Sequence, residues 1–174
     1  RALNLGRDVV GLLDVAHHRH GADLLQIGRL FRLAEHAAGL VAALGELAHL
    51  SWRLVIAGDT TRSPPTFERL TVDIAARGLG DRIELRGAVP AVALASLYGA
   101  SDLFVLASRH EGYGMAYAEA ITHGLPVVGT TAGAIPETVP AQAAILVSPD
   151  DVATLTAALR RLIESAPERE LLAA

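Results

Sequence analysis

The chain has 174 residues and no cysteine, with a net charge of −4, 51% hydrophobic residues and only 4% aromatic residues. This length fits one ordinary domain, and the apolar content argues against disorder. The composition excludes disulfides, thiolate zinc sites and cysteine nucleophiles, and the acidic balance gives no reason to expect nucleic acid as a partner.

All 15 lysine-or-arginine residues are arginines, so lysine Schiff-base chemistry and a Walker-type P-loop lysine are excluded. No apolar stretch is long enough to predict a transmembrane segment, and Arg1–Val10 lacks the apolar core of a signal peptide. We therefore expect a protein without a transmembrane segment, with the cytoplasm as its default location.

Short apolar strands alternate with longer amphipathic helices after an irregular segment at residues 1–22. The predicted strands, in chain order, are Leu24–Leu30, Arg53–Ala57, Ile83–Arg86, Leu103–Ala107, Pro126–Thr130 and Ala144–Val147. The predicted helices are Leu33–Leu50, Thr66–Ala76, Val92–Gly99, Met115–His123 and Val152–Glu164, with a short helical turn at Pro136. Parallel neighbouring strands require such crossover helices. The pattern predicts a doubly wound α/β fold, with a mostly parallel six-stranded sheet and helices on both faces.

The stretch that follows the fourth predicted strand combines glycines with two carboxylates. Gly112 and Gly114 allow close approach of the backbone, and the helix that starts near Met115 offers unpaired N–H groups with a positive dipole end. Such a turn is a cradle for a diphosphate. Glu119, one helical turn further on, is placed to reach a ribose diol, and Glu111 is placed to reach the hydroxyls of a bound sugar.

The same spacing also fits a purely structural turn. In that alternative, Gly112 and Gly114 only connect a strand to a helix, Glu111 is solvated, and Glu119 lies on an exposed helix face. Local spacing by itself favours this structural interpretation, because glycine-rich turns are common.

A longer pattern resembles a known family. Glu111 and Glu119 are separated by seven residues, and the stretch continues into Gly124-Leu125-Pro126, which is similar to the E-x7-E signature of family 4 glycosyltransferases of the GT-B type. The similarity extends from about Leu24 to Ile163. Further supporting segments are Ile27–Leu30, Arg53–Gly58, Leu97–Ser108, Gly133–Glu137 and Ile145–Asp150.

The resemblance implies a Rossmann-like domain, the C-terminal half of a GT-B enzyme, at residues 23–174, with residues 1–22 as a leading segment or interdomain linker. It implies a retaining, metal-independent transfer of sugar from a nucleoside-diphosphate sugar to an acceptor. Arg29 matches the arginine that contacts the donor diphosphate, Glu111 the carboxylate near the donor sugar, and Glu119 the ribose contact. The matching donor-binding positions also include Gly28, Gly112, Tyr113, Gly114 and Met115.

One position departs from the family pattern. A lysine commonly follows the diphosphate arginine by a few residues, and the matching position here is Ala34. Arg32 is a candidate substitute, and a solvated side chain at a helix start is the equally open alternative. His17, His18 and His20 lie near one another, but without acidic ligands at suitable spacing they predict a solvated segment, and no metal or cofactor is expected.

The family enzyme has a second, N-terminal domain that supplies most of the acceptor site. The resemblance therefore implies that this chain is the C-terminal half, that its partner is that missing domain, and that it is inactive by itself. In the full-length protein, peripheral contact with a membrane is an open possibility.

Two other functional classes share features of this sequence. A dinucleotide-binding oxidoreductase is disfavoured, because Gly28-Arg29-Leu30 stands where G-x-G-x-x-G is required. A noncatalytic interaction domain that retains the half-fold stays open, with Ala34 in its favour.

Overall fold

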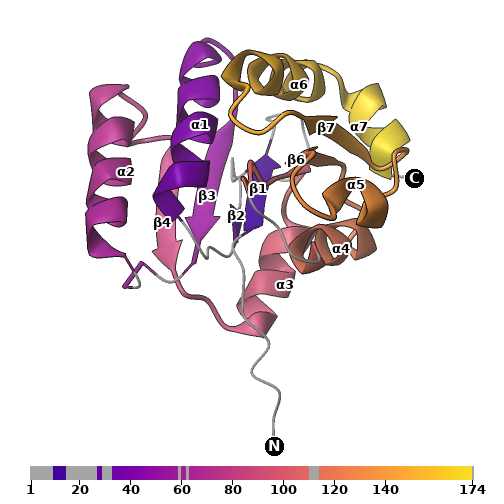
Figure 1. Ribbon diagram of the computed structural model, residues 1–174, viewed down its shortest axis with the longest axis horizontal. Coiled ribbons are helices and arrows are strands. Elements are labelled where there is room, and N and C mark those ends of the chain that lie inside the picture. The colour runs from indigo at the N-terminus through magenta and orange to yellow at the C-terminus, as the bar shows by residue number, and fades with distance from the viewer. Residues whose placement is uncertain are drawn as a thin grey trace, which may run out of the picture.

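The computed structural model describes residues 10–14, 27–28, 33–58, 60–61, 63–109 and 114–173 (Figure 1). In that part of the chain the strands are β1 (Val10–Asp14), β2 (Ile27–Gly28), β3 (Arg53–Ala57), β4 (Ile83–Gly87), β5 (Leu103–Val105), β6 (Val127–Thr130) and β7 (Ala144–Val147). The helices are α1 (Leu33–Glu46), α2 (Pro64–Ala76), α3 (Ala91–Gly99), α4 (Met115–Thr122), α5 (Ile135–Thr138), α6 (Val152–Glu164) and α7 (Ala166–Ala173).

One mostly parallel sheet organises the fold. The pairings follow the path β2-β3-β1-β5-β6-β7, and β4 pairs with β3. β3 is parallel to β2 and β4, and β5, β6 and β7 are parallel to one another. Because β1 is antiparallel to both β3 and β5, the six strands β2–β7 share one direction. The predicted α/β architecture is therefore present.

The predicted count of six strands is wrong, since the described residues form seven. The additional strand is β1, inside the segment for which the sequence predicted an irregular course. The predicted strand Leu24–Leu30 is described only at Ile27–Gly28, which pairs with Ile56 and Ala57. An antiparallel strand that fills the gap between β3 and β5 depends on tertiary pairing, which the local pattern at Val10–Asp14 does not reveal.

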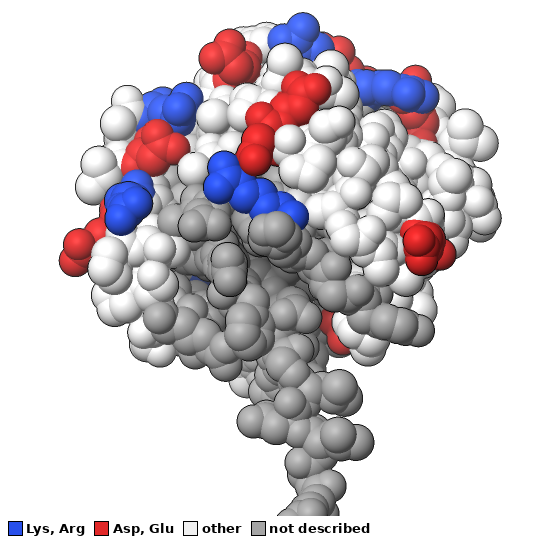
Figure 2. Space-filling model, viewed as in Figure 1, with Lys and Arg blue, Asp and Glu red and all other residues white. Residues whose placement is uncertain are grey.

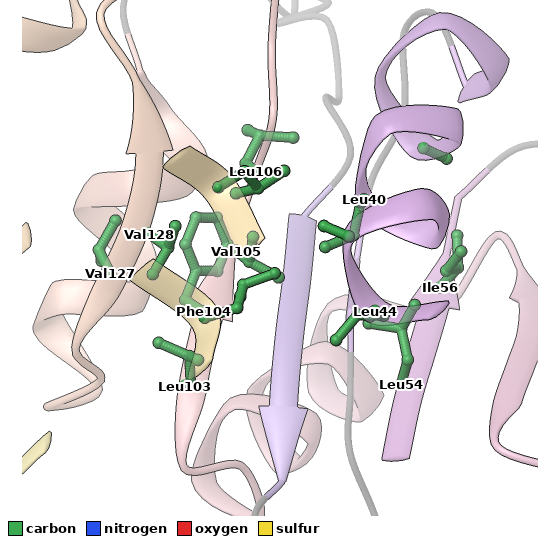
Figure 3. Packing of buried hydrophobic residues seen from close by; sticks show 14 of the residues in the cluster. Leu40, Leu44, Leu54, Ile56, Leu103, Phe104, Val105, Leu106, Val127 and Val128 are labelled. Carbon is green, nitrogen blue, oxygen red and sulfur yellow. The ribbon is translucent and has the colours of Figure 1, made fainter. Parts of the chain in front are cut away.

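The core lies on both faces of the sheet. Every residue of β5 and β6 is buried, and successive side chains of a strand point to opposite faces, so both faces of the sheet are covered at these strands. Figure 3 shows Leu40 and Leu44 of α1 beside Leu54 of β3, with Phe104 of β5 on the other side of β1. Burial on both faces explains why these strands read as continuous apolar runs.

Close packing fixes the identity of one core glycine. A Cβ atom at Gly129 in β6 would lie 2.6 Å from Cε1 of Tyr117, the fully buried tyrosine of α4. The absence of a side chain at this position therefore lets α4 approach the sheet closely. This contact brings the start of α4 to the carboxyl ends of β5 and β6.

Polar side chains close the remaining turns. Arg82 donates to the carbonyl oxygens of Ala48, Leu50 and Trp52, and its guanidinium lies 3.9 Å from the centre of the Trp52 ring. Burial, and then the charge of Arg53, lower the pKa of Arg82. In the C-terminal part of the chain, the buried Arg169 of α7 donates to the carbonyls of Leu162 and Ile163, near the end of α6. These hydrogen bonds pair backbone carbonyls at turns and at a helix end, where the regular backbone hydrogen bonding stops.

Candidate functional site

The parallel strands end at one edge of the sheet, where open α/β sheets bind ligands. β3, β4, β5, β6 and β7 all have their carboxyl ends at this edge. Just beyond it, the N–H of Gly58 donates to the carbonyl of Gly87 over 2.6 Å, which keeps the loops after β3 and β4 together. The connections after β5 and β6 carry the predicted site.

The connection after β5 is anchored from two sides. The Thr130 hydroxyl, at the end of β6, donates to the carbonyl of Ser108 over 2.5 Å, and both residues are buried. The Tyr117 hydroxyl donates to the carbonyl of Leu106 over 2.7 Å. Two side chains from α4 and β6 therefore satisfy carbonyls of the chain as it leaves the sheet. Their contacts fix the stem of the connection that leads to α4.

Gly114 caps the start of α4 in a left-handed conformation, with φ 72° and ψ 28°. A Cβ atom here would lie 3.1 Å from the Thr138 hydroxyl of α5, so the site is conformationally and sterically suited to glycine. Tyr117 and Ala118 donate to the Gly114 carbonyl. The N–H groups of Met115 and Ala116 precede these donors and have no acceptor within the helix. The helix dipole adds a partial positive charge at this point.

Glu119 lies one helical turn after Met115 and is half-buried. Its carboxylate accepts a hydrogen bond from the Tyr98 hydroxyl of α3, with 3.3 Å between Oη and Oε2. The Met115 side chain, at the helix start, is 51% exposed. The helix thus presents donor groups at its first turn and a carboxylate acceptor in its second.

An ion pair that the sequence did not single out joins two loops at the same edge. Arg109, after β5, donates from Nε to Oδ1 of Asp150, after β7, over 2.6 Å. Asp150 has φ 65°, a left-handed conformation that aspartate tolerates better than most residues. Both side chains are largely solvated, so the pair contributes little to stability by itself.

Four of the predicted site residues lie in the described part of the chain. Gly28 ends β2 and pairs with Ala57 at the carboxyl end of β3, while Gly114, Met115 and Glu119 belong to the start of α4. The other predicted positions lie outside the described residues; they are Arg29, Glu111, Gly112 and Tyr113, together with the candidate substitute Arg32.

The charged side chains of the described residues form no large patch of one sign on the face that Figure 2 shows. On the face shown in Figure 2, acidic and basic side chains are interspersed over the described residues. Within the described ranges, no three acidic or histidine side chains are grouped as a metal site would require. None of the helices placed by the structure has the length and apolar character that crossing a membrane demands.

Comparison with known proteins gives the family. The model for glycosyl transferases group 1 matches residues 21–165. The chain is 33% identical over 135 residues to the lipopolysaccharide core biosynthesis mannosyltransferase LpcC of Rhizobium leguminosarum bv. viciae, covering 76% of this chain and 34% of that protein. It is also 33% identical over 155 residues to the 2-deoxystreptamine N-acetyl-D-glucosaminyltransferase of Streptomyces fradiae, covering 88% of this chain and 33% of that protein. The chain spans about a third of the length of these relatives.

Solved structures agree on the fold. The C-terminal domain of a glycosyl transferase group 1 family protein (LpcC) from Francisella tularensis matches with a TM-score of 0.73 and 27% identity, over 82% of this chain and 76% of that one. Anabaena Alr3699/HepE, solved in complex with UDP and glucose, matches with a TM-score of 0.72 over 85% of this chain and 40% of that one. At 23% identity, the second match supports the fold alone. The chain belongs to the group 1 family of glycosyl transferases, and its fold is that of the C-terminal domain of GT-B enzymes.

Proposed function

We propose that this chain is the donor-binding part of a retaining family 4 glycosyltransferase, and that its ligand is a nucleoside-diphosphate sugar. The observation that carries the proposal is the start of α4, where a left-handed glycine and the N–H groups of the first helical turn precede a half-buried carboxylate by one turn. The E-x7-E spacing of Glu111 and Glu119 supports the family assignment. The match to the group 1 glycosyl transferase family, whose relatives include a mannosyltransferase and an N-acetyl-D-glucosaminyltransferase, supports the ligand class.

The proposed roles follow the chemistry of the donor. The first-turn N–H groups of α4 and the guanidinium of Arg29 bind the diphosphate, Glu119 accepts hydrogen bonds from the ribose, and Glu111 binds the sugar. Gly28, Gly112 and Tyr113 complete the surface around the donor. No metal is required, because helix N–H groups and guanidinium supply the positive charge.

During transfer, the bond between the anomeric carbon and the β-phosphate oxygen breaks, and that oxygen keeps the electron pair. The anomeric carbon bonds to an acceptor hydroxyl with its configuration retained, and the departing diphosphate takes up the proton of that hydroxyl. Charge grows on the departing diphosphate, so donors already aimed at it stabilise the transition state. The acceptor and its binding domain belong to the full-length protein.

Glu119→Gln provides the test. We expect the variant to bind a nucleoside diphosphate more weakly by about 1–3 kcal/mol, because a charge-assisted hydrogen bond is lost. Titration calorimetry with UDP, GDP and ADP measures the affinity and identifies the base. Glu68→Gln, an exposed glutamate of α2, is the matched control and should bind like the parent. Equal affinity for Glu119→Gln and the parent would show that the site is elsewhere.

A noncatalytic interaction domain is the second candidate. Ala34 favours it, because this residue stands where the family commonly has a lysine near the diphosphate.

Variants of the two nearby arginines separate the candidates. If Arg29 is the main cation facing the diphosphate, Arg29→Ala should weaken the binding of a nucleoside diphosphate far more than that of the uncharged nucleoside. Arg32→Ala should do so only if Arg32 replaces the lysine. If neither the parent nor any variant binds UDP, GDP or ADP at millimolar concentration, the noncatalytic function is favoured.

A further inference from the structure

Tyr98 connects two helices through the carboxylate of Glu119. It lies near the end of α3, is only 2% exposed, and donates its hydroxyl hydrogen to Oε2 of Glu119 in α4. The two residues are 21 positions apart in the chain. A buried phenol thus reaches a half-buried carboxylate on the helix whose first turn faces the carboxyl edge of the sheet.

The ring of Tyr98 is held by neighbours on both sides. It stacks on the imidazole of His123, the residue that follows α4, with 5.0 Å between ring centroids and 12° between planes. It also packs against Phe104 of β5, at 6.4 Å. Because α3, β5 and the end of α4 together fix the ring, the core determines where the hydroxyl points.

We infer that Tyr98 is a positioning residue, which orients the Glu119 carboxylate for the ribose of the donor. The inference rests on the ribose role proposed for Glu119. A free glutamate side chain samples several rotamers and must be ordered when it binds, so a bond that orders it beforehand favours binding. A carboxylate has about four acceptor positions, so one bond from Tyr98 leaves capacity for a diol.

A purely structural role for Tyr98 predicts something different. Loss of a packing contact would weaken the whole domain and would affect all ligands alike. Loss of positioning would affect only the part of the affinity that depends on the ribose hydroxyls. The two roles are therefore separated by comparing ligands with and without those hydroxyls.

The experiment measures affinities of UDP, GDP and ADP and of their 2′,3′-dideoxy forms by calorimetry, for the parent and for Tyr98→Phe. This substitution removes the hydroxyl and keeps the ring that stacks on His123. We expect the preference of the parent for the ribose form to fall by about 3–10-fold, the range for one hydrogen bond, while the dideoxy affinity changes less than about twofold. Circular dichroism and thermal unfolding verify that the variant is folded.

Ser101→Ala is the control, since it also removes a hydroxyl that follows α3. The Ser101 hydroxyl donates to the backbone carbonyl of Leu97 and does not contact Glu119. Its removal should leave the ribose preference unchanged. In a Glu119→Ala background, Tyr98→Phe should have no further effect on that preference, since the carboxylate that it orients is gone.

The outcomes separate the inference from the function on which it rests. If the parent prefers the ribose form and Tyr98→Phe keeps that preference, or loses both affinities equally, positioning by Tyr98 is overturned and the ribose site stands. If the parent binds nucleotides without any ribose preference, the role proposed for Glu119 fails and the inference fails with it. If Tyr98→Phe does not fold, an unchanged ribose preference in Glu119→Ala would likewise overturn the inference.

Discussion

At the scale of single residues, the start of α4 depends on an unusual backbone conformation at Gly114. A left-handed φ of 72° turns the chain so that the N–H groups of Met115 and Ala116 begin the helix at the sheet edge. The same residue packs against Thr138 of α5, where a Cβ atom would be 3.1 Å from the hydroxyl. Backbone conformation and space therefore both favour glycine at the cradle.

Gly114→Ala should destabilise the domain by about 1–2 kcal/mol, the cost of the left-handed conformation for an L-residue, and should also weaken nucleoside diphosphate binding. Gly124→Ala is the matched control, since Gly124 has φ 71° but no atom within 4 Å of the added Cβ. Urea unfolding measures the first effect and calorimetry the second. The cradle assignment would be contradicted if both variants lost the same binding affinity.

The sequence predicts the site residues that belong to a local chemical pattern. It does not predict residues that are linked only by contacts in the folded structure. Gly114 and Glu119 stand out because glycines and carboxylates flank a helix start. Tyr98 carries no such signal, because its hydrogen bond to Glu119 joins positions 21 residues apart on different helices. The Arg109–Asp150 pair was missed for the same reason.

At the scale of elements, buried parallel strands were predicted well because their apolar runs are continuous. β3 has the bounds that the sequence indicates, and α6 begins and ends at the predicted residues. The predicted strand Leu103–Ala107 ends earlier, at Val105, and beyond this end the Ser108 carbonyl accepts a hydrogen bond from the Thr130 hydroxyl. The unpredicted α7 is held to α6 by Arg169, a tertiary contact.

Helix α6 begins with an N-cap residue, Asp151, whose contribution to stability depends on pH. Asp151 accepts hydrogen bonds from the Thr154 hydroxyl at 2.6 Å and the Thr154 N–H at 3.0 Å, and these bonds lower its pKa below the ordinary 3.8. A lowered pKa in the folded state means that the cap contributes stability above the unfolded value, and that this contribution is lost as the pH falls through the folded value.

Asp151→Asn should therefore remove part of the acid sensitivity. Asparagine is also a good N-cap, but it does not titrate. Between about pH 5 and pH 2.5, the parent should lose more stability than Asp151→Asn, as thermal unfolding at each pH would measure. A stability difference between the two proteins that stays constant across this range would contradict a titrating cap.

At the scale of the whole molecule, the sheet brings distant segments to one edge. Gly28 of β2 pairs beside Ala57 of β3, and α4 follows β5, so segments from the first and the second half of the chain meet at the carboxyl ends of the strands. The sequence predicted this edge, because parallel strands joined by helices must end together. The place of β1 between β3 and β5 could not be predicted, since it depends on the assembled sheet.

The chain spans about a third of the length of its relatives, yet the family match covers residues 21–165, and the start of α4 lies within them. We expect the chain to bind the donor nucleotide without transferring sugar, because the groups proposed to bind the donor lie in this domain while transfer also needs an acceptor site. A ligand at about 100 times its Kd stabilises a fold by about 2.7 kcal/mol, so one of UDP, GDP and ADP should raise the Tm clearly.

A second measurement accompanies the thermal shift. It records whether the nucleoside diphosphate is released from its sugar donor when simple sugar or lipid acceptors are present. Glu119→Gln is the control, and at the same nucleotide concentration it should show a smaller rise in Tm. A rise in Tm without release supports a donor-binding part that acts together with the rest of the protein. Acceptor-dependent release by this chain would contradict the prediction, since both substrates would then have to be bound within these 174 residues.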